Sequence, residues 1–190
     1  INDWKQIASS LLSIPMAHQL IGFYTVADGG DGVLKVMRSY QYYAASAISD
    51  RVSKINWDGR DRLGGHIWHT TGSGKTMTSF KSAQLIANSK DADKVIFLMD
   101  RIELGTQSLK EYRGFADENE AVQATEDTSA LIGKLTSGDA ANTLIVTSIQ
   151  KMSNIRDEEG GMNAHDIQTI GSKRIVFIVD EAHRSTFGDM

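Results

Sequence analysis

The chain has 190 residues, of which 41% are hydrophobic and 23% charged, so it is long and apolar enough for one sizeable core. No apolar run approaches the roughly 18 residues that a membrane span needs, and the first residues lack a signal-peptide pattern, so no membrane association is predicted. The net charge of −4 excludes a polycation that binds nucleic acid through its overall field, and the absence of cysteine excludes disulfides and fits a cytoplasmic location.

The first part of the chain is predicted to be a helical lead-in. Apolar residues between Trp4 and Leu12 recur at helical spacing, and a second short helix is expected to start at Ser13 with Pro15 in its first turn. Three glycines between residues 29 and 32 then break the chain. The next helix carries an apolar face formed by Tyr40, Ala44, Ala47, Ile48, Val52 and Ile55.

The rest of the chain is predicted to be an α/β domain. Residues 1–36 form the lead-in and residues 37–190 the main domain, in which short apolar runs alternate with helical segments. This alternation is typical of a parallel sheet buried on both faces. The predicted strands are His66–His69, Val95–Met99, Leu144–Thr147 and Ile175–Val179. The predicted linking helices are Lys75–Asn88, Ile102–Phe115, Thr128–Thr136 and Ile149–Ile155.

A phosphate-binding loop is indicated by the sequence His69-Thr70-Thr71-Gly72-Ser73-Gly74-Lys75-Thr76. The two glycines permit backbone angles that turn consecutive N–H groups toward an anion, and the N-terminus of the next helix adds its dipole. Lys75 would reach the β- and γ-phosphates of ATP, and the Thr76 hydroxyl would bind Mg²⁺. The general pattern has glycine at the position of His69, and this departure occurs among helicases. The alternative is a glycine-rich turn with a chance Gly-Lys-Thr, which a chain of this length contains on the order of one time in a hundred.

A second motif, Asp180-Glu181-Ala182-His183, follows the last apolar run. Asp180 could hold the Mg²⁺ that Thr76 coordinates, Glu181 could polarise the attacking water, and His183 could couple the nucleotide to a neighbouring element. The alternative is a charged turn at a strand end, which would explain each residue singly. The two motifs together favour an ATPase that transfers a phosphoryl group to water.

Four blocks together resemble the motor subunit of type I restriction–modification enzymes, which belongs to helicase superfamily 2. The blocks are Trp68–Thr76, Asp100–Arg101 with Gln107, Val146–Met152 and Asp180–Arg184. The resemblance runs from about Val36 to Phe187. It implies a P-loop NTPase whose RecA-like parallel sheet is sandwiched by helices, as the first motor domain of that subunit. It also implies that the lead-in joins a nuclease domain to the motor.

The function implied by the resemblance is that of an ATP-dependent double-stranded DNA translocase within a type I restriction endonuclease. The implied cofactors are ATP and Mg²⁺. The implied partners are double-stranded DNA and the methyltransferase and specificity subunits of the restriction complex. Because the chain begins with Ile1 and holds one motor domain, we expect it to be part of a longer protein and to hydrolyse ATP negligibly by itself.

The resemblance also implies roles for individual residues. Gln41, which lies among four neighbouring basic and aromatic residues, is similar to the helicase element that recognises adenine; the alternative is a polar helix position among core tyrosines. The residues expected to bind ATP are Gln41, Thr71, Gly72, Ser73, Gly74, Lys75 and Thr76. The residues expected to act in catalysis are Lys75, Asp180, Glu181 and His183, with Thr76 and Asp180 as the metal ligands.

Six further residues are expected to face DNA, where hydroxyl, amide and N–H groups suit phosphate contacts without reading sequence. They are Asp100, Arg101, Gln107, Thr147, Ser148 and Gln150. Helix capping is the alternative role for Asp100, Thr147 and Ser148, and without the resemblance it would be favoured.

The resemblance predicts the strand order as well. In motors of this type, the strand after the Asp-Glu-Ala-His motif lies between the strand before the phosphate loop and the strand before the motif. That middle strand would follow Met190, so His66–His69 and Ile175–Val179 are expected not to pair with each other. Three rival functions remain open: a nucleotide-binding module without hydrolysis, a small-molecule P-loop kinase, and another superfamily-2 motor such as a type III restriction subunit or a remodeller.

Overall fold

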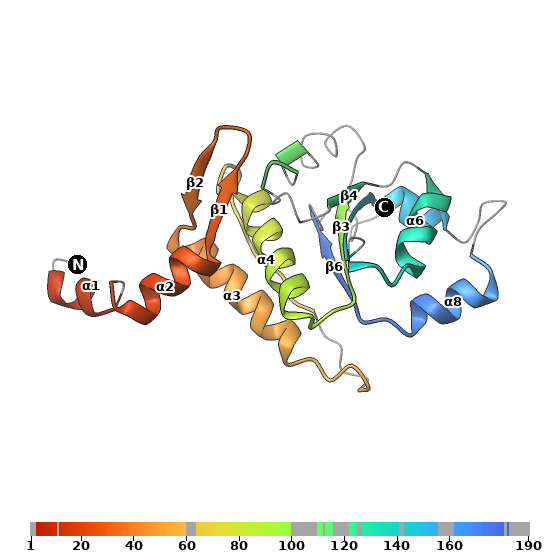
Figure 1. The fold of residues 1–190 in the computed structure, drawn as a ribbon, viewed down its shortest axis with the longest axis horizontal. Helices are drawn as coiled ribbons and strands as arrows, with labels where there is room; N and C mark the ends of the chain where they lie inside the picture. The colour runs from red at the N-terminus through yellow and green to blue at the C-terminus, as the bar shows by residue number, and fades with distance from the viewer. Residues whose placement is uncertain are drawn as a thin grey trace, which may run out of the picture.

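The computed structural model of the chain describes residues 3–10, 12–59, 64–99, 110–111, 113–115, 122–124, 127–140, 143–155, 162–180 and 182. The chain begins with helices α1 (Trp4–Ser10) and α2 (Ile14–Phe23), which extend away from the rest of the molecule (Figure 1). Pro15 lies in the first turn of α2, as predicted. No helix among the described residues is long and apolar enough to cross a membrane.

The last twelve residues of the lead-in, in which the sequence predicts a break at the glycines, form no helix. Strands β1 (Thr25–Asp28) and β2 (Val33–Val36) form an antiparallel hairpin there. Its turn holds the predicted chain-breaking glycines, of which Gly32 adopts a φ of 71° that favours glycine. The Lys35 ammonium bridges the carboxylates of Asp28 and Asp31 across the turn, at 2.5 and 2.7 Å. The division of the chain at residue 36 stays a prediction.

Two long helices follow the hairpin and pack against each other: α3 (Ser39–Ser53) and α4 (Lys75–Ser89). Both were predicted, since each carries apolar residues at helical spacing. The α4 residues Phe80, Ala83 and Ile86 are fully buried. Their burial fixes the helix against the sheet that it precedes.

In the part of the chain that the structure describes, the sheet has four strands, all parallel: β3 (Lys94–Met99), β4 (Val122–Ala124), β5 (Leu144–Ser148) and β6 (Ile175–Val179). Its order is β4-β5-β3-β6. The linking helices are α6 (Thr128–Thr136), α7 (Ile149–Asn154) and α8 (Ala164–Gly171). The structure thus confirms the α/β fold with a parallel sheet, and it adds β4 and α8, which the sequence did not predict.

Helices cover both faces of the sheet (Figure 1). On one face, Val95 and Phe97 of β3 pack in a cluster with the buried residues of α4. On the other face, Ile96 packs in a second cluster that includes Leu131 and Leu135 of α6. Successive side chains of a strand point to opposite faces, so one continuous apolar run serves both clusters. This is the sandwich that the resemblance implied.

The predicted strand His66–His69 is not formed. Residues 64–70 belong to no helix or strand, and Trp68 is 91% exposed. A strand needs a neighbour for its N–H and C=O groups, and apolar residues alone do not supply one. Among the described residues β6 pairs only with β3, so no ladder joins this segment to β6. Because the segment forms no strand, the predicted order with a strand between the two stays a prediction. The outward-facing residues of β6, Phe177 and Val179, are exposed at that edge of the sheet.

The first residue of β3 is a buried lysine. Lys94 is 1% exposed, and its N–H donates to the carbonyl oxygen of Arg174 beside β6. Burial, together with the nearby ammonium of Lys173, lowers the pKa of Lys94 to about 8. The charged amine therefore opposes folding at neutral pH.

Replacing Lys94 by methionine should stabilise the protein at pH 7 by up to about 3 kcal/mol, because a pKa near 8 lies well below the ordinary 10.5 and methionine carries no charge. The unfolded chain holds the proton up to about pH 10.5, so the stability of the wild type should rise between pH 8 and 10.5 and the advantage of Lys94→Met should shrink. Urea unfolding across this range measures both effects. Lys54→Met, at an exposed site, is the control. If the free energies of unfolding of Lys94→Met and wild type changed in parallel with pH, the lowered pKa of Lys94 would be contradicted.

Candidate nucleotide site

The predicted phosphate loop is a tight turn directly before α4. The Ser73 N–H and the Ser73 hydroxyl both donate to the Thr70 carbonyl oxygen, at 3.2 and 2.7 Å. Gly72 and Gly74 have φ angles of 74° and 79°, in the region that favours glycine. The structure therefore uses these two glycines in the backbone role that the sequence predicts for them.

The first turn of α4 has no side-chain cap. Gly74 is the N-cap residue, and it has no side chain to accept from the N–H groups that follow it. Lys75 is the first residue of the helix, and Thr76 is the second; both are partly buried. The N-terminus of a 15-residue helix favours an anion through its dipole.

The loop lies at the carboxyl edge of the parallel sheet. Helix α4 packs on β3 and leads into it through residues 90–93, so it runs antiparallel to β3, and its N-terminus lies where β3 ends. Asp180 follows β6 at the same edge, and its N–H donates to the Leu98 carbonyl oxygen of β3 at 3.0 Å. The fold thus places the loop and Asp180 at one edge, which is where parallel sheets bind their ligands.

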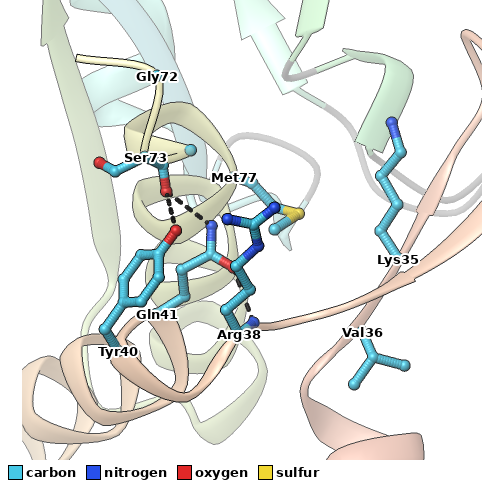
Figure 2. A pocket seen from close by; sticks show the side chains of 9 residues that line it. Lys35, Val36, Arg38, Tyr40, Gln41, Gly72, Ser73 and Met77 are labelled. Carbon is cyan, nitrogen blue, oxygen red and sulfur yellow. Dashed lines mark hydrogen bonds between the residues drawn. The ribbon is translucent and has the colours of Figure 1, made fainter. Parts of the chain in front are cut away.

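The start of α3 contacts the loop directly (Figure 2). The Tyr40 hydroxyl and the Gln41 side-chain amide both donate to the Ser73 carbonyl oxygen, each at 3.0 Å. The side-chain oxygen Oε1 of Gln41 accepts from the Arg38 backbone N–H at 2.9 Å, and this hydrogen bond caps α3. Gln41 is 2% exposed. This residue, predicted to recognise adenine, therefore holds the loop and the helix end in the structure, and its contact with adenine stays a prediction.

A cavity of about 330 Å³ opens between the loop and the start of α3 (Figure 2). The hairpin and α4 supply the walls that the sequence did not predict, namely Lys35, Val36 and Met77. The remaining lining residues are Arg38, Tyr40, Gln41, Gly72, Ser73 and Gly74. Nothing marks Lys35 or Val36 in the sequence, because the hairpin brings them to the loop from outside any motif. Asp28 and Asp31, hydrogen-bonded to Lys35, raise the pKa of its amine, which stays charged beside the cavity.

The side chain of His69 contacts the loop from its other end. Its Nδ1 lies 2.9 Å from the Ser73 hydroxyl oxygen. The Tyr40 ring packs edge-on against the His69 ring, with centroids 5.9 Å apart and an interplanar angle of 64°. Thr71, also predicted to bind ATP, is exposed in the turn between His69 and Ser73.

The residues predicted to face DNA are described only in part. Thr147 and Ser148 end β5 and are 3% and 5% exposed. The Ser148 hydroxyl accepts from the Lys151 N–H at 3.2 Å and caps α7, which is the alternative role considered for it. Gln150 is exposed in the first turn of α7. The roles of these three residues toward DNA stay predictions.

Five predicted site residues lie outside the described residues. They are Asp100, Arg101, Gln107, Glu181 and His183. The structure places their described neighbours, Met99 and Asp180, at the carboxyl edge of the sheet that also holds the phosphate loop.

Comparison with known proteins identifies the family. The family model described as SWI2/SNF2 ATPase matches residues 40–190. The Type I restriction enzyme SauMSSORF170P endonuclease subunit of Staphylococcus aureus (strain MSSA476) is 40% identical over 190 residues, which are 100% of this chain and 19% of that protein. The chain thus spans about a fifth of that relative's length.

Two further relatives have similar descriptions. The protein described as the C-terminal part of the putative type I restriction enzyme MpnIIP endonuclease subunit, from Mycoplasma pneumoniae, is 39% identical over 161 residues, 83% of this chain and 76% of that protein. The putative type I restriction enzyme MjaIXP endonuclease subunit of Methanocaldococcus jannaschii is 30% identical over 156 residues, 80% of this chain and 14% of that protein. The chain therefore belongs to the SWI2/SNF2 ATPase family and carries the helicase-like ATPase domain of a type I restriction endonuclease subunit.

Proposed function

We propose that this chain binds ATP with Mg²⁺ and forms the ATP-binding part of a double-stranded DNA translocase within a type I restriction endonuclease. The observation that carries the proposal is the geometry of the loop. Two glycines in the left-handed region turn the chain directly into the uncapped N-terminus of α4, at the carboxyl edge of a parallel sheet. Such a turn is suited to an anion with several oxygen atoms, such as a triphosphate.

The roles of the residues follow from their places on that edge. Lys75 would reach the β- and γ-phosphates from the first turn of α4. Thr76 and Asp180 supply the hydroxyl and the carboxylate that Mg²⁺ prefers, so they fit the metal by their chemistry. When bound, Mg²⁺ offsets the negative charge of the phosphate oxygens. Glu181 would orient the attacking water, and His183 would couple the site to the rest of the protein.

The DNA track is proposed for the same edge of the sheet. The predicted contacts are Asp100, Arg101 and Gln107 after β3, with Thr147, Ser148 and Gln150 at the end of β5 and the start of α7. The exposure of Gln150 supports contact with phosphate groups. The names of the relatives support a type I restriction enzyme as the setting. The proposal adds methyltransferase and specificity subunits as partners and the cytoplasm as the location.

Glu181→Gln should separate binding from hydrolysis in the full-length polypeptide that carries this sequence. The amide cannot accept a proton from water, so ATP turnover with duplex DNA should fall about a hundredfold or more. ATP affinity should stay within about twofold, because Glu181 is assigned to the water and not to the phosphates. A phosphate-release assay and a calorimetric titration measure the two quantities. Asp58→Asn, at an exposed carboxylate, is the control. ATP turnover in Glu181→Gln equal to that of wild type would contradict the catalytic role proposed for Glu181.

A further inference from the structure

We infer that Tyr40 and His69 are positioning residues for the phosphate loop: Tyr40 holds the Ser73 carbonyl and His69 the Ser73 hydroxyl, so that the loop presents its N–H groups to a triphosphate. The inference rests on the proposed function and deepens it. It assigns Tyr40 to the triphosphate and not to the adenine base. It also gives His69, which stands where the general loop pattern has glycine, a role of its own.

The Ser73 carbonyl is the first of two groups that are held. It accepts two hydrogen bonds from the start of α3, one from the Tyr40 hydroxyl and one from the Gln41 amide, both at 3.0 Å. A trans peptide unit is planar, so its C=O and the following N–H point in opposite directions. With the carbonyl turned toward α3, the Gly74 N–H is directed away from α3. This N–H directly precedes the uncapped N–H groups of α4.

The Ser73 hydroxyl is the second group that is held. Its single proton is donated to the Thr70 carbonyl oxygen at 2.7 Å, so toward His69 the oxygen can act only as an acceptor. The His69 Nδ1, at 2.9 Å, must then carry a proton and donate. One neutral tautomer and the charged form both satisfy this requirement. The side chain of Ser73 is therefore held by two consecutive residues at the start of the turn, His69 and Thr70.

The two holding residues also support each other. The Tyr40 ring packs edge-on against the His69 ring at a centroid distance of 5.9 Å, across 29 positions of sequence. An edge-on aromatic contact of this kind favours one relative orientation of the rings. Tyr40 is exposed for nearly half of its surface, so its ring is not a core residue whose packing the fold requires.

The departure from the glycine pattern has a physical reason here. Among the described residues other than glycine, only Lys90 has a positive φ, so the backbone at His69 does not need glycine. A side chain is therefore allowed at that position, and the one present reaches Ser73 four residues ahead. A glycine would leave the Ser73 hydroxyl held by Thr70 alone.

The test compares two ligands in the full-length polypeptide: ATP and inorganic tripolyphosphate, each with Mg²⁺. Tyr40→Phe keeps the ring and removes one donor to the Ser73 carbonyl. It should weaken both ligands by the same factor, about two- to tenfold, because the loop binds the phosphates of both. Tyr43→Phe, on the same helix and without a hydrogen bond from its hydroxyl among the described residues, should change neither affinity.

His69→Ala should weaken the binding of ATP and tripolyphosphate by the same factor. His69→Asn should recover most of that affinity, because the asparagine amide can donate to the Ser73 hydroxyl oxygen from a similar distance. The thermal midpoint of Tyr40→Phe should match that of wild type, which excludes a general loss of structure. A loss for ATP with none for tripolyphosphate would assign Tyr40 to the base and overturn the inference. Wild-type affinities in both Tyr40→Phe and His69→Ala would overturn it too.

Failure of the inference differs from failure of the proposed function. If Lys75→Ala binds neither ligand while the Tyr40 and His69 variants bind both as well as wild type, the loop binds phosphate and only the positioning roles are wrong. If wild type binds neither ligand, or Lys75→Ala binds both as well as wild type, the loop is no phosphate site and both proposals fall.

Discussion

Replacing Lys75 by alanine should lower the affinity for Mg²⁺-ATP by tenfold or more in the full-length polypeptide. Lys75 is the first residue of α4, directly after Gly74, where its ammonium adds to the positive end of the helix dipole. A charge-assisted contact with phosphate contributes about 1.5–3 kcal/mol, and each 1.4 kcal/mol is tenfold in affinity. A calorimetric titration measures the difference.

The control for this prediction is Lys54→Ala, at an exposed lysine at the end of α3. It removes the same charge from the protein, so it separates the local contact from the overall field. Equal affinities for Lys75→Ala and wild type would mean that the loop is only a structural turn.

Replacing Phe80 by alanine should destabilise the protein by about 3–5 kcal/mol, the usual cost of removing a buried aromatic ring. Phe80 is fully buried on the face of α4 that packs on the sheet, and its ring lies 5.6 Å from that of Phe115. Because the phosphate loop lies at the end of this helix, the variant should also bind ATP more weakly wherever unfolding is partial.

Urea unfolding measures the change in stability. Phe23→Ala is the matched control, since Phe23 is about half exposed at the end of α2 and should cost little. A destabilisation below about 1 kcal/mol for Phe80→Ala would show that α4 is held by something other than this core.

The elements that could be predicted from the sequence are those whose pattern of apolar residues reflects their own burial in the core. The helix Thr128–Thr136 has the predicted bounds, and β3, β5 and β6 were recognised as apolar runs. The run His66–His69 has a similar composition and forms no strand, because strand formation depends on a neighbour that the pattern does not reveal. The hairpin is short, and β4 has three residues, so neither offers enough periodicity to be predicted.

The same division holds for the site. The loop from Gly72 to Thr76 could be predicted because its residues are contiguous and each meets a local requirement of backbone angle or charge. The contacts of Tyr40 with Ser73 and of Lys35 with the cavity could not, because they join residues more than 30 positions apart. Such contacts depend on how α3 and the hairpin pack, which no local pattern encodes.

The two loop glycines differ in which other residues their positions can accept. A Cβ at Gly72 would meet nothing within 4 Å, so only its φ of 74° restricts the site, and asparagine or aspartate can adopt that angle at modest cost. A Cβ at Gly74 would collide with the Gln41 amide nitrogen as well. Position 72 can therefore accept a few residue types other than glycine. Change at position 74 requires a compensating change at position 41, so these two positions should covary across homologous sequences.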